Sequence, residues 1–184
     1  SGLFFEVTDE QRLIRNSVER LVEDHYSLQN RVAYGGEPDG WSRDVWQRFS
    51  QLGVLGLTVP THHGGFGGGA LDLAVVMEAL GRAMVLEPFF ATVALGVQAL
   101  KVAGSEEQQA EWFPRVMAGS TTIAFAHSEP RIEESGSATR AATVEDGWRL
   151  SGKKVLVLNG AGADFAIVSA QAEGEKNRGA SLFL

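Results

Sequence analysis

The sequence predicts an α+β fold in which an all-α helical bundle precedes an antiparallel β-barrel-like domain. Up to residue 119, apolar residues recur every three or four positions, which is the spacing of amphipathic helices. From residue 120 they form short runs between turn residues, which is typical of strands. We therefore expect a helical domain over residues 1–119 and an incomplete β-domain over residues 120–184.

Five helices are expected, and most of them begin at a clear signal. Thr8 and Ser105 are each followed three residues later by a glutamine, which completes a capping box. Pro88 suits the first turn of a helix, where the N–H that proline lacks is not needed. The helices are expected after Thr8, from Ser42 to Gly53, over residues 71–84 and 88–102, and from Ser105 to Gly119.

The β-domain is expected to contain one hairpin and four further strands. Asp146–Gly147 lies between two alternating segments, which is a strong hairpin signal. The other strands are expected in TTIAFAHS (121–128), KVLVLN (154–159), DFAIVSA (164–170) and GASLFL (179–184). The last of these runs to Leu184, so an apolar edge would stay unpaired unless the native protein continues or another chain covers it.

Composition excludes several classes of function. The 184 residues carry a formal net charge of -7, which argues against a nucleic-acid-binding surface. The sequence has no cysteine, so disulfides, thiolate nucleophiles and cysteine-based metal sites are excluded. No apolar run is long enough to insert into a membrane. An acidic chain without disulfides fits a cytoplasmic protein.

The segment THHGGFGGGALDL (61–73) suggests a metal site or a phosphate-binding loop, and we predict neither. His62 and His63 are neighbours, and neighbouring side chains of an extended segment point to opposite faces. No carboxylate nearby in the sequence completes a ligand set, so two surface histidines and no metal are expected. The glycines lack the Lys-Ser/Thr of a P-loop and the βαβ context of a dinucleotide fold. We interpret them as a tight turn before a buried helix.

His127, Ser128 and Glu129 suggest nucleophilic catalysis at first sight. Adjacent strand residues alternate between faces, so the three side chains cannot form a relay with one another. We interpret Ser128, beside Glu129 at a strand end, as part of a hydrogen-bonding platform.

Four segments, taken in order, resemble the acyl-CoA dehydrogenase family. They are VTDEQRLIRNSVERLVEDH, FSQLGVLGLTVPTHHGGFGGGALDLAVVMEALGRA, GSEEQQAEWFPRVMAGSTTIAFAHSEP and GWRLSGKKVLVLNGAGADFAIVSA, and together they cover nearly the whole chain. The combination is specific, although each motif alone is not. AFAHSEP with GKKVLVLNG most resembles the small subunits of bacterial two-component acyl-CoA dehydrogenases, of the pimeloyl-CoA dehydrogenase type.

The resemblance implies a helical N-terminal domain, a β-barrel-like middle domain and a C-terminal four-helix domain, the last missing from this chain. It implies FAD as cofactor and an acyl-CoA as substrate. In the family, a glutamate removes the substrate's α-proton while the β-hydrogen leaves as hydride to flavin N5. That glutamate is expected beyond residue 184, so we expect no catalytic base in this chain and no catalysis by this chain alone.

The resemblance also assigns residues to the cofactor. The family pattern Y-x-x-T-E-P matches residues 125–130, and Ser128 keeps the hydroxyl of the threonine that contacts the flavin. The pattern G-x-K-x-W-I-T-N matches residues 152–159, where Leu156 replaces the stacking tryptophan and Leu158 the threonine bound to N5. The cofactor-binding residues implied are Phe125, Ala126, His127, Ser128, Leu156 and Leu158.

For the substrate, the resemblance points to the helix that starts at Pro88 and to the segment EPRIEESGS. Ala91, Thr92 and Leu95 would lie beside the acyl group, where small residues would leave room for a long or bulky one. Ser137 would recover part of the family's glycine-rich turn, although Glu133 and Glu134 add negative charge there.

Three functions follow as hypotheses. The first is an FAD-dependent acyl-CoA dehydrogenase subunit that passes electrons to an electron-transfer flavoprotein or similar acceptor. The second is a catalytically impaired or flavin-poor structural subunit of a heteromeric acyl-CoA dehydrogenase, as Leu156 and Leu158 would allow. The third is a flavin oxidase or hydroxylase on the same fold. Each implies a homo- or hetero-oligomer with another subunit of the same family.

Overall fold

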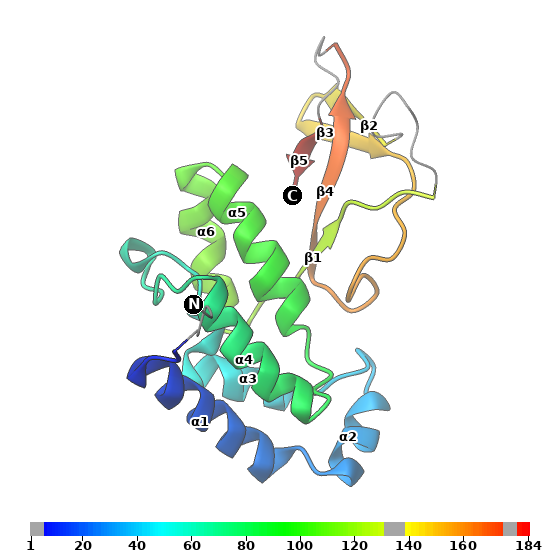
Figure 1. The fold of residues 1–184 in the computed structure, drawn as a ribbon. Helices are drawn as coiled ribbons and strands as arrows, with labels where there is room; N and C mark the ends of the chain where they lie inside the picture. The colour runs from blue at the N-terminus through cyan, green and yellow to red at the C-terminus, as the bar shows by residue number, and fades with distance from the viewer. Residues whose placement is uncertain (1–5, 131–138, 175–179) are drawn as a thin grey trace, which may run out of the picture.

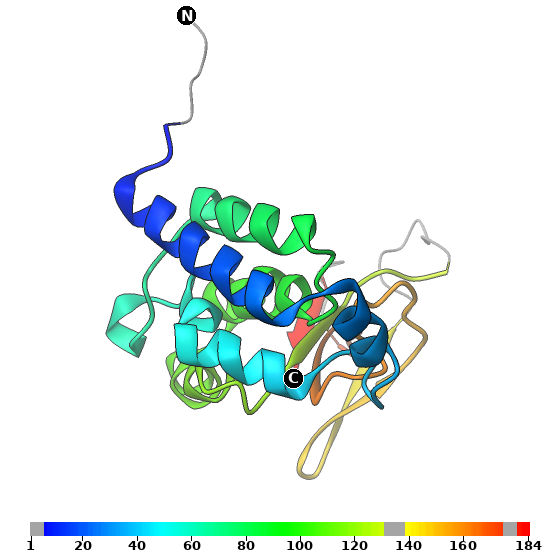
Figure 2. The ribbon, with the colours of Figure 1, turned by 90° about the horizontal axis from the view of Figure 1, so that it is seen from below.

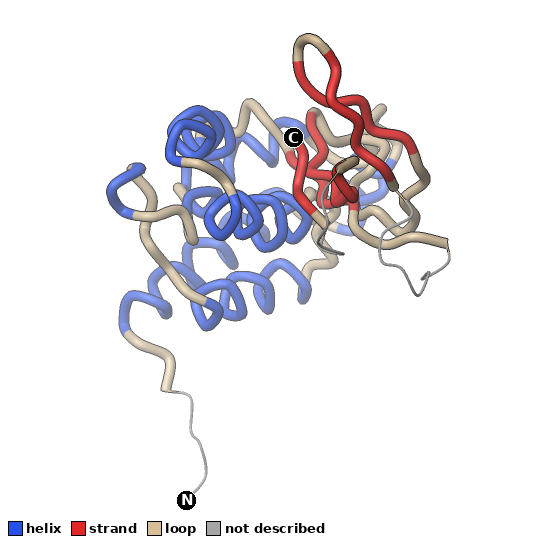
Figure 3. The backbone as a smooth tube through the Cα atoms, turned by 90° about the horizontal axis from the view of Figure 1, so that it is seen from above, coloured by secondary structure: helices blue, strands red, loops and turns tan. Residues whose placement is uncertain are grey.

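The computed structural model describes residues 6–130, 139–174 and 180–184. Helices form one side of the molecule and a small sheet forms the other, as Figures 1 and 3 show. The last helix ends at Met117 and the first strand begins at Ile123, so the change from helix to strand occurs where the sequence pattern changes.

All five expected helices are present. Thr8 and Ser105 cap their helices through the reciprocal hydrogen bonds of a capping box. An additional short helix, α2, was not expected from the sequence, and none of its residues is fully buried. The helical segments are α1 (Asp9–His25), α2 (Leu28–Gly35), α3 (Arg43–Leu52), the 3₁₀-helices η1 (Val54–Gly56) and η2 (Thr61–His63), α4 (Ala70–Arg82), the π-helix η3 (Phe90–Val97), α5 (Gln98–Ala103) and α6 (Glu106–Met117).

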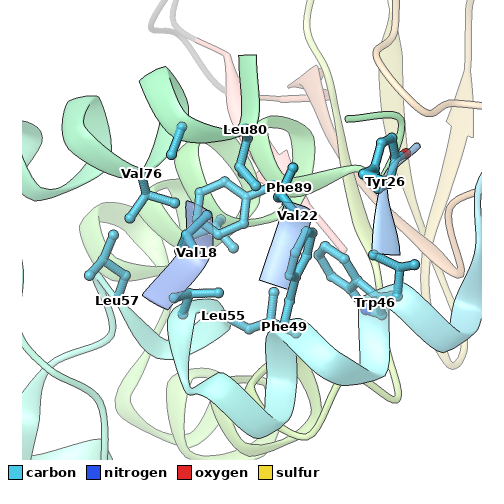
Figure 4. Packing of buried hydrophobic residues seen from close by; sticks show 14 of the residues in the cluster. Val18, Val22, Tyr26, Trp46, Phe49, Leu55, Leu57, Val76, Leu80 and Phe89 are labelled. Atoms are coloured by element: carbon cyan, nitrogen blue, oxygen red, sulfur yellow. The ribbon is translucent and has the colours of Figure 1, made fainter. Parts of the chain in front are cut away.

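The main core lies between α1, α3 and α4, which pack around aromatic and β-branched side chains (Figures 2 and 4). Trp46 and Phe49 of α3 are fully buried there, as is Val18 of α1. Burial of one such side chain stabilises the fold by about 1.5–3 kcal/mol. No helix among the described residues has both the length and the apolar character required to span a membrane.

The sheet is mixed, which corrects the expectation of an antiparallel β-barrel-like domain. Strand β4 is central: β1 and β2 pair with it in parallel, and β5 pairs with it antiparallel. Only β2 and β3 form the expected hairpin. The connections from β1 to β2 and from β3 to β4 are long enough to cross over, so β1 and β2 can each pair with β4 in parallel. The strands are β1 (Ile123–Ala126), β2 (Arg140–Val144), β3 (Gly147–Ser151), β4 (Phe165–Ala172) and β5 (Ser181–Phe183).

The strand expected in KVLVLN is wrong, because residues 153–162 form a loop and turns. Leu156 and Asn159 both have φ of 54°, in the left-handed region that interrupts a strand. The alternating apolar side chains of this segment do not pack into a sheet face: Leu156 is 90% exposed and Leu158 is 52% exposed. Alternation alone therefore misidentified the segment as a strand.

Strand β1 packs directly on η3, and this contact joins the sheet to the helices. Thr92 Oγ1 accepts a hydrogen bond from Ile123 N at 3.2 Å and lies 3.4 Å from Ile123 O, to which it can donate. One turn further on, Gly96 presents no side chain to Ile123. A Cβ at Gly96 would lie 2.9 Å from Ile123 Cβ, which is too close for two carbon atoms.

Asp164 makes a second junction between helices and sheet. Its Oδ2 accepts hydrogen bonds of 2.8 Å from both Thr122 N and Thr122 Oγ1, and its Oδ1 lies 3.2 Å from Arg43 of α3. Burial alone would raise the pKa of Asp164. The hydrogen bonds from Thr122 and the contact with Arg43 outweigh burial and hold that pKa below its ordinary value of 3.8.

Gly96→Ala should destabilise the protein by about 1–3 kcal/mol, because the new methyl group forces β1 away from η3. Gly81→Ala in α4 is the matched control, because a Cβ there meets no atom within 4 Å. Alanine should stabilise that exposed helical position by about 0.5–1 kcal/mol. Urea unfolding measures both values, and equal effects at the two glycines would contradict the close contact.

Asp164→Asn should destabilise the protein by about 1.5–3 kcal/mol at pH 7, the usual range for hydrogen bonds to a charged group. The pKa of Asp164 is lowered on folding, so its contribution is complete above about pH 4 and is lost as the pH falls through the folded-state value. The difference between wild type and variant should therefore shrink at pH 2–3.

The control for this prediction is Asp44→Asn. Asp44 is 73% exposed and pairs only along its own helix with Arg48, so the change should cost less than about 0.5 kcal/mol. Urea titrations of both variants at pH 7 and at pH 3 provide the measurement. A difference for Asp164→Asn that stays constant with pH would show that the carboxylate charge is not involved.

Candidate functional site

The two segments expected at the cofactor lie side by side at one end of the sheet. Val155 N donates a hydrogen bond of 2.9 Å to Ser128 O, and Lys154 Nζ donates one of 3.1 Å to His127 O. His127, Ser128, Leu156 and Leu158 are all exposed. We refer to these four residues, carried on the adjoining segments 127–128 and 155–158, as the ledge.

A buried ion pair fixes the backbone of the ledge. Lys154 Nζ lies 2.6 Å from Glu129 Oε1, and the two side chains are only 8% and 7% exposed. Glu129 Oε1 also accepts hydrogen bonds from the backbone N and the hydroxyl of Thr139, at 3.1 and 2.8 Å. Glu129 directly follows Ser128, and Lys154 directly precedes Val155. The ion pair therefore connects both segments of the ledge to Thr139, at the start of β2.

Ser169 of β4 connects this ion pair to His127. Lys154 Nζ donates to Ser169 Oγ at 3.0 Å, and Ser169 Oγ lies 3.0 Å from His127 Nδ1. The Ser169 hydroxyl therefore contacts both the ammonium group of Lys154 and the imidazole of His127. The imidazole lies parallel to the Phe125 ring, 6.0 Å away.

Leu156 adopts a backbone conformation that costs energy. For a residue with a Cβ, the left-handed region costs about 1–2 kcal/mol, and the side chain of Leu156 gains little burial in return. Strain of this kind is concentrated at functional sites. Contact of this apolar side chain with a cofactor stays a prediction.

The expected cofactor residues are therefore brought together. Phe125 and Ala126 belong to β1 and lead directly into the ledge, which holds the other four. What the sequence did not show is the buried pair of Lys154 with Glu129, because the two residues lie 25 positions apart and only the fold brings them into contact.

The expected substrate residues are placed differently. Ala91 and Thr92 are buried, and the hydroxyl of Thr92 is engaged by the backbone of β1. The structure thus shows Thr92 holding the strand, whereas its contact with a substrate stays a prediction. Leu95 is half-buried in η3. Ser137 lies outside the described residues, as do Glu133 and Glu134.

The glycine-rich segment forms a tight turn before α4, as expected. A Cβ at Gly65 would lie 2.2 Å from Val59 O, so only glycine allows the two backbone stretches to approach. The premise that the two histidines lie on an extended segment was wrong, however. Residues 61–63 form η2 rather than an extended segment, so the rings of His62 and His63 lie 4.3 Å apart. Glu106, distant in sequence, supplies a carboxylate beside them.

A further buried carboxylate, Glu87, stabilises the helical part. Tyr26 OH donates to Glu87 Oε2 at 2.7 Å, and Ser42 N donates to Oε1 at 3.1 Å. Burial raises the pKa of Glu87, although these hydrogen bonds act in the opposite direction. Glu87 therefore connects the end of α1 to the start of α3. It is distant in sequence from the ledge.

The helical part of the chain decides the family. Residues 8–120 match the family model of the acyl-CoA dehydrogenase N-terminal domain. The chain belongs to the acyl-CoA dehydrogenase family.

Relatives extend the similarity past the helices. Mitochondrial isovaleryl-CoA dehydrogenase of Pongo abelii is 29% identical over 171 residues, covering 91% of this chain and 40% of that protein. The chain thus spans less than half the length of this curated relative. The ChsE4–ChsE5 complex from Mycobacterium tuberculosis matches with a TM-score of 0.84 and 25% identity, over 98% of this chain and 48% of the solved one. An acyl-CoA dehydrogenase from Bacillus anthracis complexed with FAD matches with a TM-score of 0.80 and 27% identity, over 96% and 30% of the two chains.

The apolar and hydrogen-bonding groups of the ledge are of the kinds that could contact the edge of a flavin. A flavin ring is flat and largely apolar, with hydrogen-bonding atoms at its rim. The exposed leucines offer apolar contact, and Ser128 offers a hydroxyl and backbone groups. Leu156 cannot stack as an aromatic ring would, and Leu158 cannot donate a hydrogen bond.

Lys154→Met should destabilise the protein by about 3–5 kcal/mol, because it removes the ammonium group that pairs with the largely buried Glu129 carboxylate. Lys153→Met is the control: Lys153 is the exposed neighbour on the same segment, and its loss should cost less than about 0.5 kcal/mol. Urea unfolding at pH 7 compares the two. A small effect at Lys154, equal to that at Lys153, would show that the pair does not anchor the ledge.

Proposed function

We propose that the chain is part of an FAD-dependent acyl-CoA dehydrogenase that removes hydrogens from the α and β carbons of an acyl-CoA thioester. The observation that supports this most is the ledge, where two segments far apart in the sequence are held together beside β1 by a buried ion pair. Family membership and the FAD-bound relative from Bacillus anthracis support the choice of cofactor.

In this proposal, residues of the ledge orient the cofactor and keep water from one side of it. Flavin, when bound, accepts hydride from the substrate at N5. Ser128 donates or accepts a hydrogen bond at the flavin rim, and its backbone is held by Val155. Leu156 and Leu158 cover the ring with apolar surface. The base that takes the α-proton is assigned to a residue outside 1–184.

We further propose an oligomer that includes a second subunit of the same family, with an electron-transfer flavoprotein or similar acceptor as electron partner, in the cytoplasm. The two-component ChsE4–ChsE5 complex supports a heteromeric arrangement. Several large apolar side chains in or beside the sheet are also exposed, and another protein chain could cover them: Trp148, Leu150, Phe165, Leu182 and Leu184.

We also propose that the chain divides into a helical domain over residues 1–119 and a β-domain over residues 120–184.

A second candidate rests on the ledge itself. Leu156 and Leu158 lack the aromatic face and the hydroxyl that the family resemblance assigns to these positions. A subunit that binds flavin weakly and supports a catalytic sister subunit would accommodate both leucines.

The visible spectrum of the purified full-length protein tests the proposal. We expect flavin absorption that bleaches when an acyl-CoA is added without oxygen. Ser128→Ala should weaken flavin binding about fivefold, the value of one hydrogen bond of about 1 kcal/mol. Flavin that is retained only after mixing with a partner subunit would favour the second candidate. Absence of flavin under both conditions would contradict both candidates.

A further inference from the structure

We propose that His62, His63 and Glu106 bind a divalent cation of the Zn²⁺ type, which links η2 to the first turn of α6. Each of the three side chains offers one ligand atom, and these atoms all lie within 4.8 Å of one another. The site is remote in sequence from the ledge, and the proposal does not depend on the activity proposed above.

The turn that carries the histidines is rigid. His63 N donates to Pro60 O at 3.0 Å, and Gly64 N donates to Thr61 O at 2.9 Å, which closes η2 as a 3₁₀ turn. Gly64 has φ of 85°, a conformation that glycine adopts at little cost, and it ends the turn. The two imidazoles are therefore presented on the same side of the chain, not on opposite sides.

His63 supplies the observation that points to a ligand. Its side chain is only 8% exposed, and its ring packs edge-on against Phe113 at 5.2 Å between centroids. His63 Nε2 is buried and makes no hydrogen bond, although Glu106 Oε1 lies only 3.2 Å away. A buried polar nitrogen without a hydrogen bond costs about 1–3 kcal/mol unless another partner satisfies it.

The geometry favours a shared cation over a simple ion pair. In an ion pair, the Nε2–H bond would point at the carboxylate oxygen and register as a hydrogen bond. Two ligands of one tetrahedral metal instead point their lone pairs at the ion, not at each other. With metal–ligand bonds of about 2.0–2.1 Å, tetrahedral ligand atoms lie about 3.3 Å apart, close to the 3.2 Å between Nε2 and Oε1.

The ligand types select the metal. Two imidazoles and one carboxylate suit Zn²⁺ or a similar transition ion rather than Mg²⁺ or Ca²⁺, which prefer oxygen ligands alone. Three protein ligands leave a fourth position for water, because His62 and Glu106 are exposed. The positive end of the α6 dipole disfavours a cation, but Glu106 and Glu107 in its first turn offset it.

Isothermal titration of ZnCl₂ into the full-length protein, freed of metal by EDTA, tests the proposal. We expect one Zn²⁺ per chain in the micromolar range. Glu106→Gln and His62→Ala should each weaken binding at least about 10- to 100-fold, since even the loss of a group behind a metal ligand costs this much. Both residues are exposed, so neither change threatens folding. His63→Leu, which keeps an apolar contact with Phe113, should have the same effect.

Glu107→Gln is the matched control, because Glu107 is the exposed neighbour on the same turn and does not belong to the three. It should bind Zn²⁺ as the wild type does. The proposal is overturned if the wild type binds no Zn²⁺ in this range. It is equally overturned if Glu106→Gln and His62→Ala bind as well as the wild type, or if Glu107→Gln loses binding to the same extent.

Discussion

The position of β1 on η3 is the constraint on which the rest of the chain depends. Gly96 has no side chain, so β1 can approach η3 closely. Thr92 Oγ1 accepts a hydrogen bond from the backbone N–H of Ile123, which is buried in this contact. Because β1 pairs with β4, this contact also places the central strand of the sheet. Asp164, just before β4, binds Thr122, just before β1, so the two parallel strands begin from one polar junction.

The ledge follows from that placement. Once β1 and β4 lie in register, Ser169 of β4 faces His127 beyond the end of β1, and Lys154 can reach both. Glu129 then receives the cation and the hydrogen bonds of Thr139 within one buried cluster. The polar groups in this cluster come from segments far apart in the chain, so their positions depend on the long-range pairing of the sheet.

The sequence predicted the features that depend on local patterns and missed those that depend on distant contacts. Capping at Thr8 and Ser105 and the hairpin of β2 and β3 are local, and all were confirmed, with the turn one residue earlier than expected, at Glu145 and Asp146. The strand at 154–159 was wrong because alternation says nothing of whether a neighbouring strand is available. The carboxylate beside His62 and His63 was missed for a similar reason, since Glu106 approaches them only through the packing of α6. The cofactor residues came from a family resemblance, which the comparisons confirmed at the level of the family.

Stability alone does not account for the ledge. A buried ion pair such as Lys154 with Glu129 is often no more stable than well-packed apolar side chains of the same volume. Leu156 adds a conformational cost of about 1–2 kcal/mol and stays almost fully exposed. The main core between α1, α3 and α4 consists mainly of apolar side chains packed together. Polar fixation and strain coincide at the ledge, which supports the proposal that its two segments hold a defined position for a cofactor.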